Sequence, residues 1–216
     1  MGPALAPRLC PLNYQWVLLV LIEMAPAGSL SEADGTAAEN PFPNGIRNHQ
    51  DVIIGRISAA NFNLSGQSGT LGYFCIRKRK FINRREIYVL SNSHVLADLR
   101  KAKPDETELI LQPSPGEPGN NRPIAALVNF SPLKFTGHTN EPNHIDATIG
   151  RLWESHPYQT LIPLIGAVQG LRRKENIEIG EPVRKFGRTT GFTQGSVFSI
   201  YLDILIRYER TGRWRR

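Results

Sequence analysis

The 216-residue sequence has few cysteines and no long apolar stretch, and both shortages exclude classes of protein. Its two cysteines, Cys10 and Cys75, cannot build a disulfide-rich scaffold. No apolar run reaches the roughly 18 residues that a helix needs to cross a bilayer, which argues against an integral membrane protein. The hydrophobic share of 40% and the charged share of 21% are ordinary for a globular protein and argue against global disorder.

Glycine and proline are plentiful instead, with 19 and 16 residues, which indicates many turns and short strands rather than a helical bundle. Short segments rich in β-branched and aromatic residues predict the strands. These are Val52–Ile57, Gly69–Ile76, Glu86–Leu90, Glu108–Leu111, Ile124–Phe130, Ile145–Leu152, Pro182–Gly187 and Gly195–Tyr208. Residues 153–169 contain two prolines and are interpreted as a connector. The pattern predicts an all-β fold of the barrel or sandwich kind.

The N-terminal 50 residues are predicted to be a leader and linker. Arg8, the apolar run Trp16–Ile22 and the small residues Ala25-Pro26-Ala27 outline a secretory signal. A disordered extension or an over-early start codon explains the same residues, so the localisation stays open between a secreted or periplasmic and a cytoplasmic protein. Residues 25–50 show no sustained periodicity and are interpreted as a linker or disordered arm.

Positive charge is in excess, since 26 lysines and arginines against 19 acidic residues give a net charge of +7. Much of this charge lies in two clusters, residues 77–85 and the arginines of residues 207–216. Such clusters can serve a nucleic acid or an anionic surface. No nucleic-acid recognition motif accompanies them, and apolar segments flank the first cluster on both sides, so a hairpin tip is the favoured interpretation.

Two motifs carry the chemistry that the sequence predicts. The segment Ser91-Asn92-Ser93-His94 closes an apolar strand and gives His94 a rigid backbone with solvent in front, which suits a general base. A lone histidine in such a place is more often a structural residue. Asp146 lies in the otherwise apolar segment Ile145–Leu152, and a buried carboxylate requires a hydrogen-bond donor. The ring N–H of a histidine is the donor used in Ser-His-Asp chemistry.

The order and spacing of these motifs resemble those of the trypsin-like, chymotrypsin-fold serine peptidases, especially bacterial ones. His94 and Asp146 are 52 residues apart (146 − 94), against about 45 in that template. The resemblance covers roughly residues 52–206 and rests on Gly69-Thr70-Leu71-Gly72, Tyr88–Leu96, Asp146-Ala147-Thr148-Ile149 and Val183–Gly191. It implies a serine endopeptidase with a polypeptide substrate and no cofactor, in which His94 is the general base and Asp146 orients it.

The third member of the triad has no match. The template places the nucleophilic serine about 90 residues after the aspartate, near position 236, and no Gly-Asp-Ser-Gly occurs in the chain. Ser68 in Gly66-Gln67-Ser68-Gly69 precedes the histidine, and Ser196 lacks the flanking acidic residue and second glycine. Ser155 lies in the connector without a motif, and Cys75 is interpreted as a small core residue. None of them is a convincing substitute.

A metal site is the other chemistry considered for this region. His138, His144, Asp146 and His156 fall within 19 residues but match no tight pair of metal ligands. We therefore expect no metal and no cofactor.

The sequence thus predicts a chymotrypsin-like Greek-key architecture in three parts: a leader and linker (1–50), a nearly complete first barrel carrying His94 and Asp146 (51–157), and a connector with the first strands of an incomplete second barrel (158–216). The missing serine leaves two interpretations open. One is a fragment, mis-called gene model or frameshifted copy of an active peptidase. The other is a non-catalytic binding module on a peptidase-like barrel, and a basic nucleic-acid-binding protein is less favoured than either.

Overall fold

The computed structural model describes residues 8–13, 45–64, 67–78, 85–97, 108–134, 143–170, 172–201 and 203–208, with the backbone alone for 8–13, 78 and 203–208. Several predicted features lie outside these residues. They are the apolar run and cleavage-like motif of the leader, the basic tip at 79–84, His138 and the last eight residues of the arginine-rich tail.

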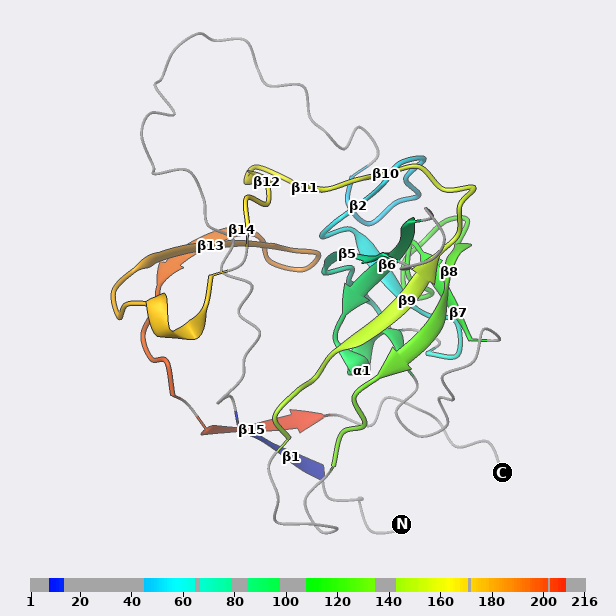
Figure 1. Cartoon of the computed structure of the whole chain (residues 1–216). Helices are drawn as coiled ribbons and strands as arrows, with labels where there is room; N and C mark the ends of the chain where they lie inside the picture. Colours follow the sequence, from blue (N-terminus) through cyan, green and yellow to red (C-terminus); the bar gives the residue numbers. More distant parts are fainter. Residues whose placement is uncertain are drawn as a thin grey trace, which may run out of the picture.

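The fold is built on one antiparallel sheet of seven strands in the order β4-β3-β7-β8-β9-β6-β5. The strands are β3 (Ser58–Asn61), β4 (Gly69–Thr70), β5 (Tyr73–Lys78), β6 (Arg85–Ser91), β7 (Leu109–Gln112), β8 (Arg122–Phe130) and β9 (Thr148–Leu152). β4 and β5 stand at opposite ends of this order, yet only Leu71 and Gly72 separate them in the chain. The sheet is therefore curled into a half-barrel (Figure 1).

The hydrophobic core gathers apolar side chains from nearly every strand of this sheet. Ile57, Leu71, Val89, Ile110 and Ile124 are fully buried within one cluster. β9 shows the expected alternation, with buried residues at every second position, because successive side chains of a strand point to opposite faces. The all-β fold that the sequence predicts is confirmed, since strands predominate and the described residues contain only two one-turn helices.

The two helices are α1 (Ser93–Leu96), which follows β6, and the 3₁₀ turn η2 (Lys174–Asn176). No helix in the described part of the chain is long and apolar enough to cross a membrane.

Most of the predicted strands are present, some with shifted ends. β6 and β8 cover the predicted segments, β7 is shifted by one residue from its prediction, and β13 (Pro182–Gly187) matches its prediction residue for residue. The β5–β6 hairpin is confirmed by a continuous antiparallel ladder from Tyr73↔Leu90 to Lys78↔Arg85. The predicted strand Gly195–Tyr208 is wrong as one element, since β14 (Gly191–Ser196) and β15 (Asp203–Tyr208) are separate strands.

The second half of the chain forms smaller sheets beside the half-barrel (Figure 1). β13 pairs with β14 as a hairpin, and the predicted connector contains the two-residue strands β10 (Tyr158–Gln159), β11 (Leu161–Ile162) and β12 (Gly166–Ala167). β10 pairs with β2 (Ile53–Ile54) in parallel, which fastens the connector to the first half.

Two segments that the sequence analysis assigns to the leader and linker are part of these sheets or of their core. Arg8–Asn13 forms β1, which pairs with β15. Ile46 packs against the core, and its carbonyl accepts a hydrogen bond from the Ser58 amide. The buried side chain of Gln112 holds the same segment, because its amide nitrogen donates to the Asn48 carbonyl and its oxygen accepts from the Gln50 amide.

Candidate active site

The turn after β6 carries His94. β6 ends at Ser91, Asn92 is extended, and Ser93–Leu96 makes the single helical turn α1. The Ser93 side chain is buried, and its hydroxyl donates to the Ala147 carbonyl at 2.8 Å. This bond fixes the start of α1, directly before His94, to the segment that precedes β9.

Asp146 lies two residues before β9 begins, whereas the sequence analysis placed it inside a strand. β9 is antiparallel to β6, and their ladder ends with the pair Ser91↔Thr148. The residues that follow β6 and those that precede β9 therefore meet at the same edge of the sheet. This register brings Asp146 to His94 across 52 residues of sequence.

The Asp146 carboxylate binds α1 through both of its oxygens. Oδ2 lies 2.5 Å from Nδ1 of His94, and Oδ1 accepts from the Ser93 amide at 2.6 Å and from the His94 amide at 3.4 Å. The Asp146 side chain is 8% exposed, whereas that of His94 is 38% exposed. The amide of Asn92 also donates to the Asp146 carbonyl, at 3.0 Å. A buried carboxylate thus orients a histidine whose ring reaches the surface.

The pKa of Asp146 lies below its usual range. Burial opposes this, because desolvation disfavours the charged form. The side-chain hydrogen bond and the positive charge of His94, with the two backbone N–H donors, outweigh the burial. Asp146 is therefore ionised at neutral pH and places the proton of a neutral imidazole on Nδ1, which makes Nε2 the basic nitrogen.

This lowered pKa predicts how the site contributes to stability as the pH changes. A carboxyl group with a lower pKa in the folded than in the unfolded state stabilises the fold above its unfolded value of about 3.9, and this contribution is lost as the pH falls through the folded pKa. We expect the free energy of unfolding of the wild type to exceed that of Asp146→Asn near pH 5, with the difference shrinking below about pH 4. Urea unfolding from pH 5 down to about pH 2 measures it. If the free energies of unfolding of the two proteins differed by the same amount at pH 5 and at pH 2, the lowered pKa of Asp146 would be contradicted.

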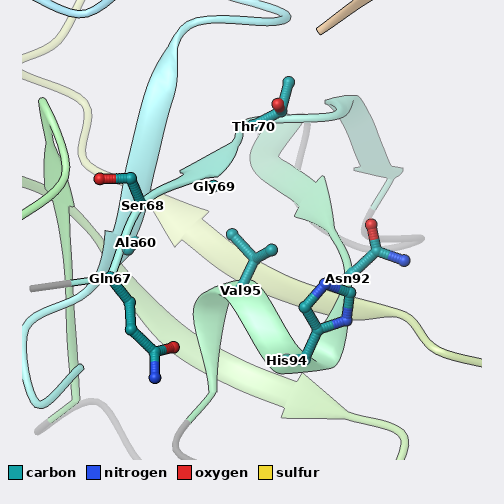
Figure 2. Close-up of a pocket in the computed structure, with 8 residues that line it drawn as sticks. All are labelled: Ala60, Gln67, Ser68, Gly69, Thr70, Asn92, His94 and Val95. Atoms are coloured by element: carbon teal, nitrogen blue, oxygen red, sulfur yellow. The ribbon is translucent and has the colours of Figure 1, made fainter. Parts of the chain in front are cut away.

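A pocket of about 260 Å³ opens beside His94. Its lining comes from β3, β4, the residues before β4 and the α1 turn: Ala60, Gln67, Ser68, Gly69, Thr70, Asn92, His94 and Val95. Figure 2 shows the imidazole at one end of this pocket and Ser68 at the other, with the Ser68 hydroxyl directed away from the ring. Ser68 lines the same pocket as His94 but does not present its oxygen to the base.

The remaining candidate nucleophiles lie in other elements. Ser196 ends β14 and Ser155 is in the turn after β9, and both are exposed. Cys75 lies in β5, where burial raises the pKa of its thiol, which disfavours the reactive thiolate. None of the three lines the pocket beside His94.

His138, one of the four residues considered as metal ligands, lies outside the described residues. His144 is exposed, and no group of three or more His, Cys, Asp or Glu side chains in the described ranges is arranged to hold a metal ion.

Sequence reasoning missed the residues that support α1 from behind. Asn61 of β3 is fully buried, and its amide donates to the Leu96 carbonyl at 3.0 Å and to the Glu108 carboxylate at 2.7 Å. Ser91 donates from its hydroxyl to the Thr70 carbonyl at 2.7 Å. Neither contact leaves a local signal, because each joins residues at least 21 positions apart.

No protein-family model matches the chain, and no curated protein matches its sequence.

Proposed function

We propose that His94 and Asp146 are the general base and the orienting carboxylate of a trypsin-like serine endopeptidase. The proposed fold is the chymotrypsin-like one, which has two Greek-key barrels. In this proposal the curled sheet is the first of the two barrels. The proposed substrate is a polypeptide, and the reaction needs no cofactor. The observation that carries the proposal is the buried Asp146 carboxylate, 2.5 Å from Nδ1 of a half-exposed histidine at the rim of a pocket.

The proposed chemistry is acyl transfer. Nε2 of His94 takes the proton of a serine hydroxyl as its oxygen attacks the scissile carbonyl, and the imidazolium then gives this proton to the leaving amine. The negative charge of Asp146 stabilises the imidazolium between these two steps. Water repeats the sequence on the acyl-enzyme and restores the serine.

The proposal assigns the base and its orienting carboxylate to these 216 residues and names no nucleophile among them. The second candidate function is a binding module on the same scaffold, and the orientation of Ser68 away from His94 favours it (Figure 2). Both candidates use the same pocket, so only a test for an activated serine separates them.

A fluorophosphonate probe, which phosphonylates activated serines with loss of fluoride, provides that test on the natural gene product. The peptidase proposal predicts that one serine is labelled in the wild type and that the labelling is lost in His94→Ala, whereas the binding module predicts no labelled serine. The labelled serine is identified by peptide mass mapping, and labelling of Ser68, Ser155 or Ser196 would identify the nucleophile within this chain. No labelled serine in a folded wild-type protein would reject the peptidase and support the binding module.

A further inference from the structure

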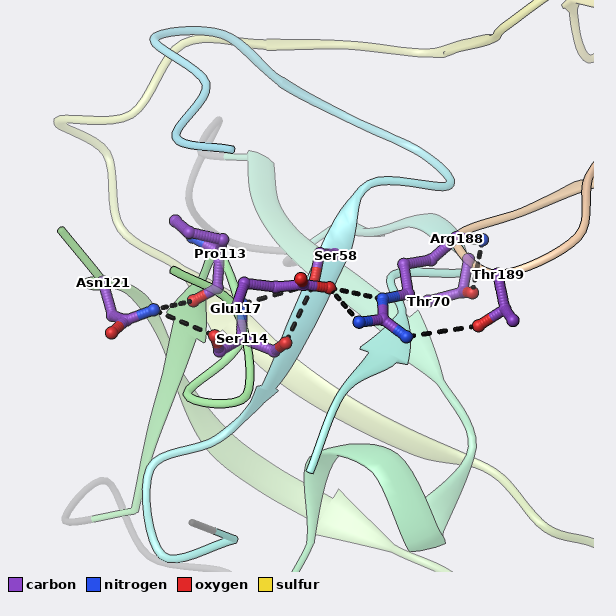
Figure 3. Close-up of polar contacts among 8 residues, drawn as sticks. All are labelled: Ser58, Thr70, Pro113, Ser114, Glu117, Asn121, Arg188 and Thr189. Atoms are coloured by element: carbon purple, nitrogen blue, oxygen red, sulfur yellow. Dashed lines mark hydrogen bonds and ion pairs between the residues drawn. The ribbon is translucent and has the colours of Figure 1, made fainter. Parts of the chain in front are cut away.

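An ion pair largely shielded from solvent joins the second half of the chain to the curled sheet. Arg188, in the turn between β13 and β14, contacts the Glu117 carboxylate through both Nε and Nη2. The Glu117 side chain is 4% exposed and that of Arg188 16% exposed. The Ser58 hydroxyl donates to the same carboxylate at 3.2 Å and lies 2.9 Å from the Ser114 hydroxyl (Figure 3). We call Arg188 and Glu117 the clamp.

The clamp reaches the pocket through Thr70 of β4. The Arg188 amide donates to the Thr70 hydroxyl oxygen at 3.0 Å, and Thr70 lines the pocket together with His94. The carbonyl of Thr70 in turn accepts from the Ser91 hydroxyl, three residues before His94. Two hydrogen bonds to Thr70 therefore link Arg188 of the clamp to Ser91, the last residue of β6 before the turn that carries His94.

A second contact joins β4 to α1 without hydrogen bonds. Gly69 lies so close to Val95 that a Cβ atom at position 69 would be 2.3 Å from a methyl carbon of Val95. Since real Cβ contacts are never this short, only glycine fits at position 69, and β4 packs its backbone directly against the Val95 side chain. A displacement of β4 therefore moves Val95, the residue next to His94 in the sequence.

Stability alone is a weak reason to bury such a pair. Desolvation of two charges offsets much of their attraction, and an apolar replacement of similar size is often as stable. What an arginine–carboxylate pair supplies is a fixed geometry, because the guanidinium is planar and rigid.

We propose that Arg188 and Glu117 are positioning residues: the clamp holds β4 against α1 and thereby fixes the His94 imidazole on Asp146. This inference deepens the proposed function, because it rests on the role of His94 as the base. It predicts that loss of the clamp loosens the His94–Asp146 hydrogen bond while the core of the sheet stays intact.

Solvent exchange of the His94 Nδ1 proton, measured by NMR on the full chain, tests this proposal. Arg188→Gln and Glu117→Gln are each expected to accelerate this exchange by about 2- to 30-fold, the range of long-range coupling energies of 0.5–2 kcal/mol. Exchange of the Ile124 amide in the core strand β8 should not change. The reversed pair, Arg188→Glu with Glu117→Arg, is expected to restore most of the slow exchange.

Two further variants separate positioning from folding. Thr70→Val keeps the shape of the side chain but removes the acceptor of the Arg188 amide, so it should accelerate the exchange even if the charge variants fold poorly. Arg172→Gln breaks a different ion pair in the second half of the chain, Arg172–Glu181, and should leave the exchange unchanged.

The outcomes distinguish this proposal from the function on which it rests. A protected Nδ1 proton that no clamp variant affects would overturn the clamp and leave the peptidase proposal standing. Acceleration in Arg172→Gln equal to that in Arg188→Gln would also overturn it. A wild-type protein without a protected Nδ1 proton would overturn both proposals.

Discussion

Asp146→Asn is expected to lower the rate constant of fluorophosphonate labelling of the natural gene product by about 10⁴-fold, the loss seen when the carboxylate of a Ser-His-Asp triad becomes an amide. The physical reason is the tautomer. An ionised Asp146 only accepts hydrogen bonds, and it therefore keeps the proton on Nδ1 of His94 at 2.5 Å. An amide can donate to Nδ1, which moves the proton to Nε2 and removes the base.

Asp146→Glu is the matched control for charge. It keeps the carboxylate but adds a methylene within a site that also binds two backbone N–H groups. We expect a loss smaller than that of Asp146→Asn, because a misplaced carboxylate still favours the correct tautomer. Labelling of Asp146→Asn within a few-fold of the wild-type rate would contradict the role assigned to Asp146.

Gly72→Ala is expected to destabilise the protein by about 2–3 kcal/mol, at the upper part of the range for overpacking a close-packed site. Gly72 lies between β4 and β5, where the sheet turns back on itself, and its amide donates to the Leu90 carbonyl at 2.7 Å. A Cβ atom there would lie 2.5 Å from the Leu90 carbonyl oxygen. This neighbour is backbone within a paired strand, so relief requires β5 and β6 to separate.

Gly195→Ala provides the control for the general effect of replacing glycine in a strand. Gly195 lies in β14, and a Cβ atom there meets no other atom within 4 Å. We expect its free energy of unfolding to equal or slightly exceed that of the wild type, since alanine has less freedom in the unfolded chain. Urea denaturation of both variants makes the comparison. Equal stabilities of Gly72→Ala and Gly195→Ala would show that the curl does not depend on this close approach.

The sequence predicts a strand most readily when the strand's own residues are apolar enough to be buried. β8 is rich in apolar residues, several of them β-branched, and its centre is buried, so composition predicts it. β3 was missed because its sequence Ser-Ala-Ala-Asn has low strand propensity, yet all four residues are buried. Its polar ends find partners far away in sequence: Ser58 in Ser114 and Glu117, Asn61 in Leu96 and Glu108. Local pattern cannot reveal such contacts.

The residues of the candidate site likewise fall into those that the sequence predicts and those that it does not. His94 and Asp146 could be found because each breaks an apolar segment, and their pairing follows from the antiparallel register of β6 and β9. The clamp could not be found, since Arg188 looks like one of many surface cations in a basic chain and Glu117 lies in a loop rich in glycine and proline. Their pairing depends on how the β13–β14 hairpin meets the half-barrel, which no local pattern encodes.

The protonation of the His94 ring tests the central claim most directly. Imidazole ¹⁵N chemical shifts, recorded on the full chain under conditions where the ring is neutral, report which nitrogen carries the proton. The account predicts a proton on Nδ1, facing Asp146, and a bare, basic Nε2. A proton on Nε2 would contradict it, because a nitrogen that already holds a proton cannot accept one from a serine.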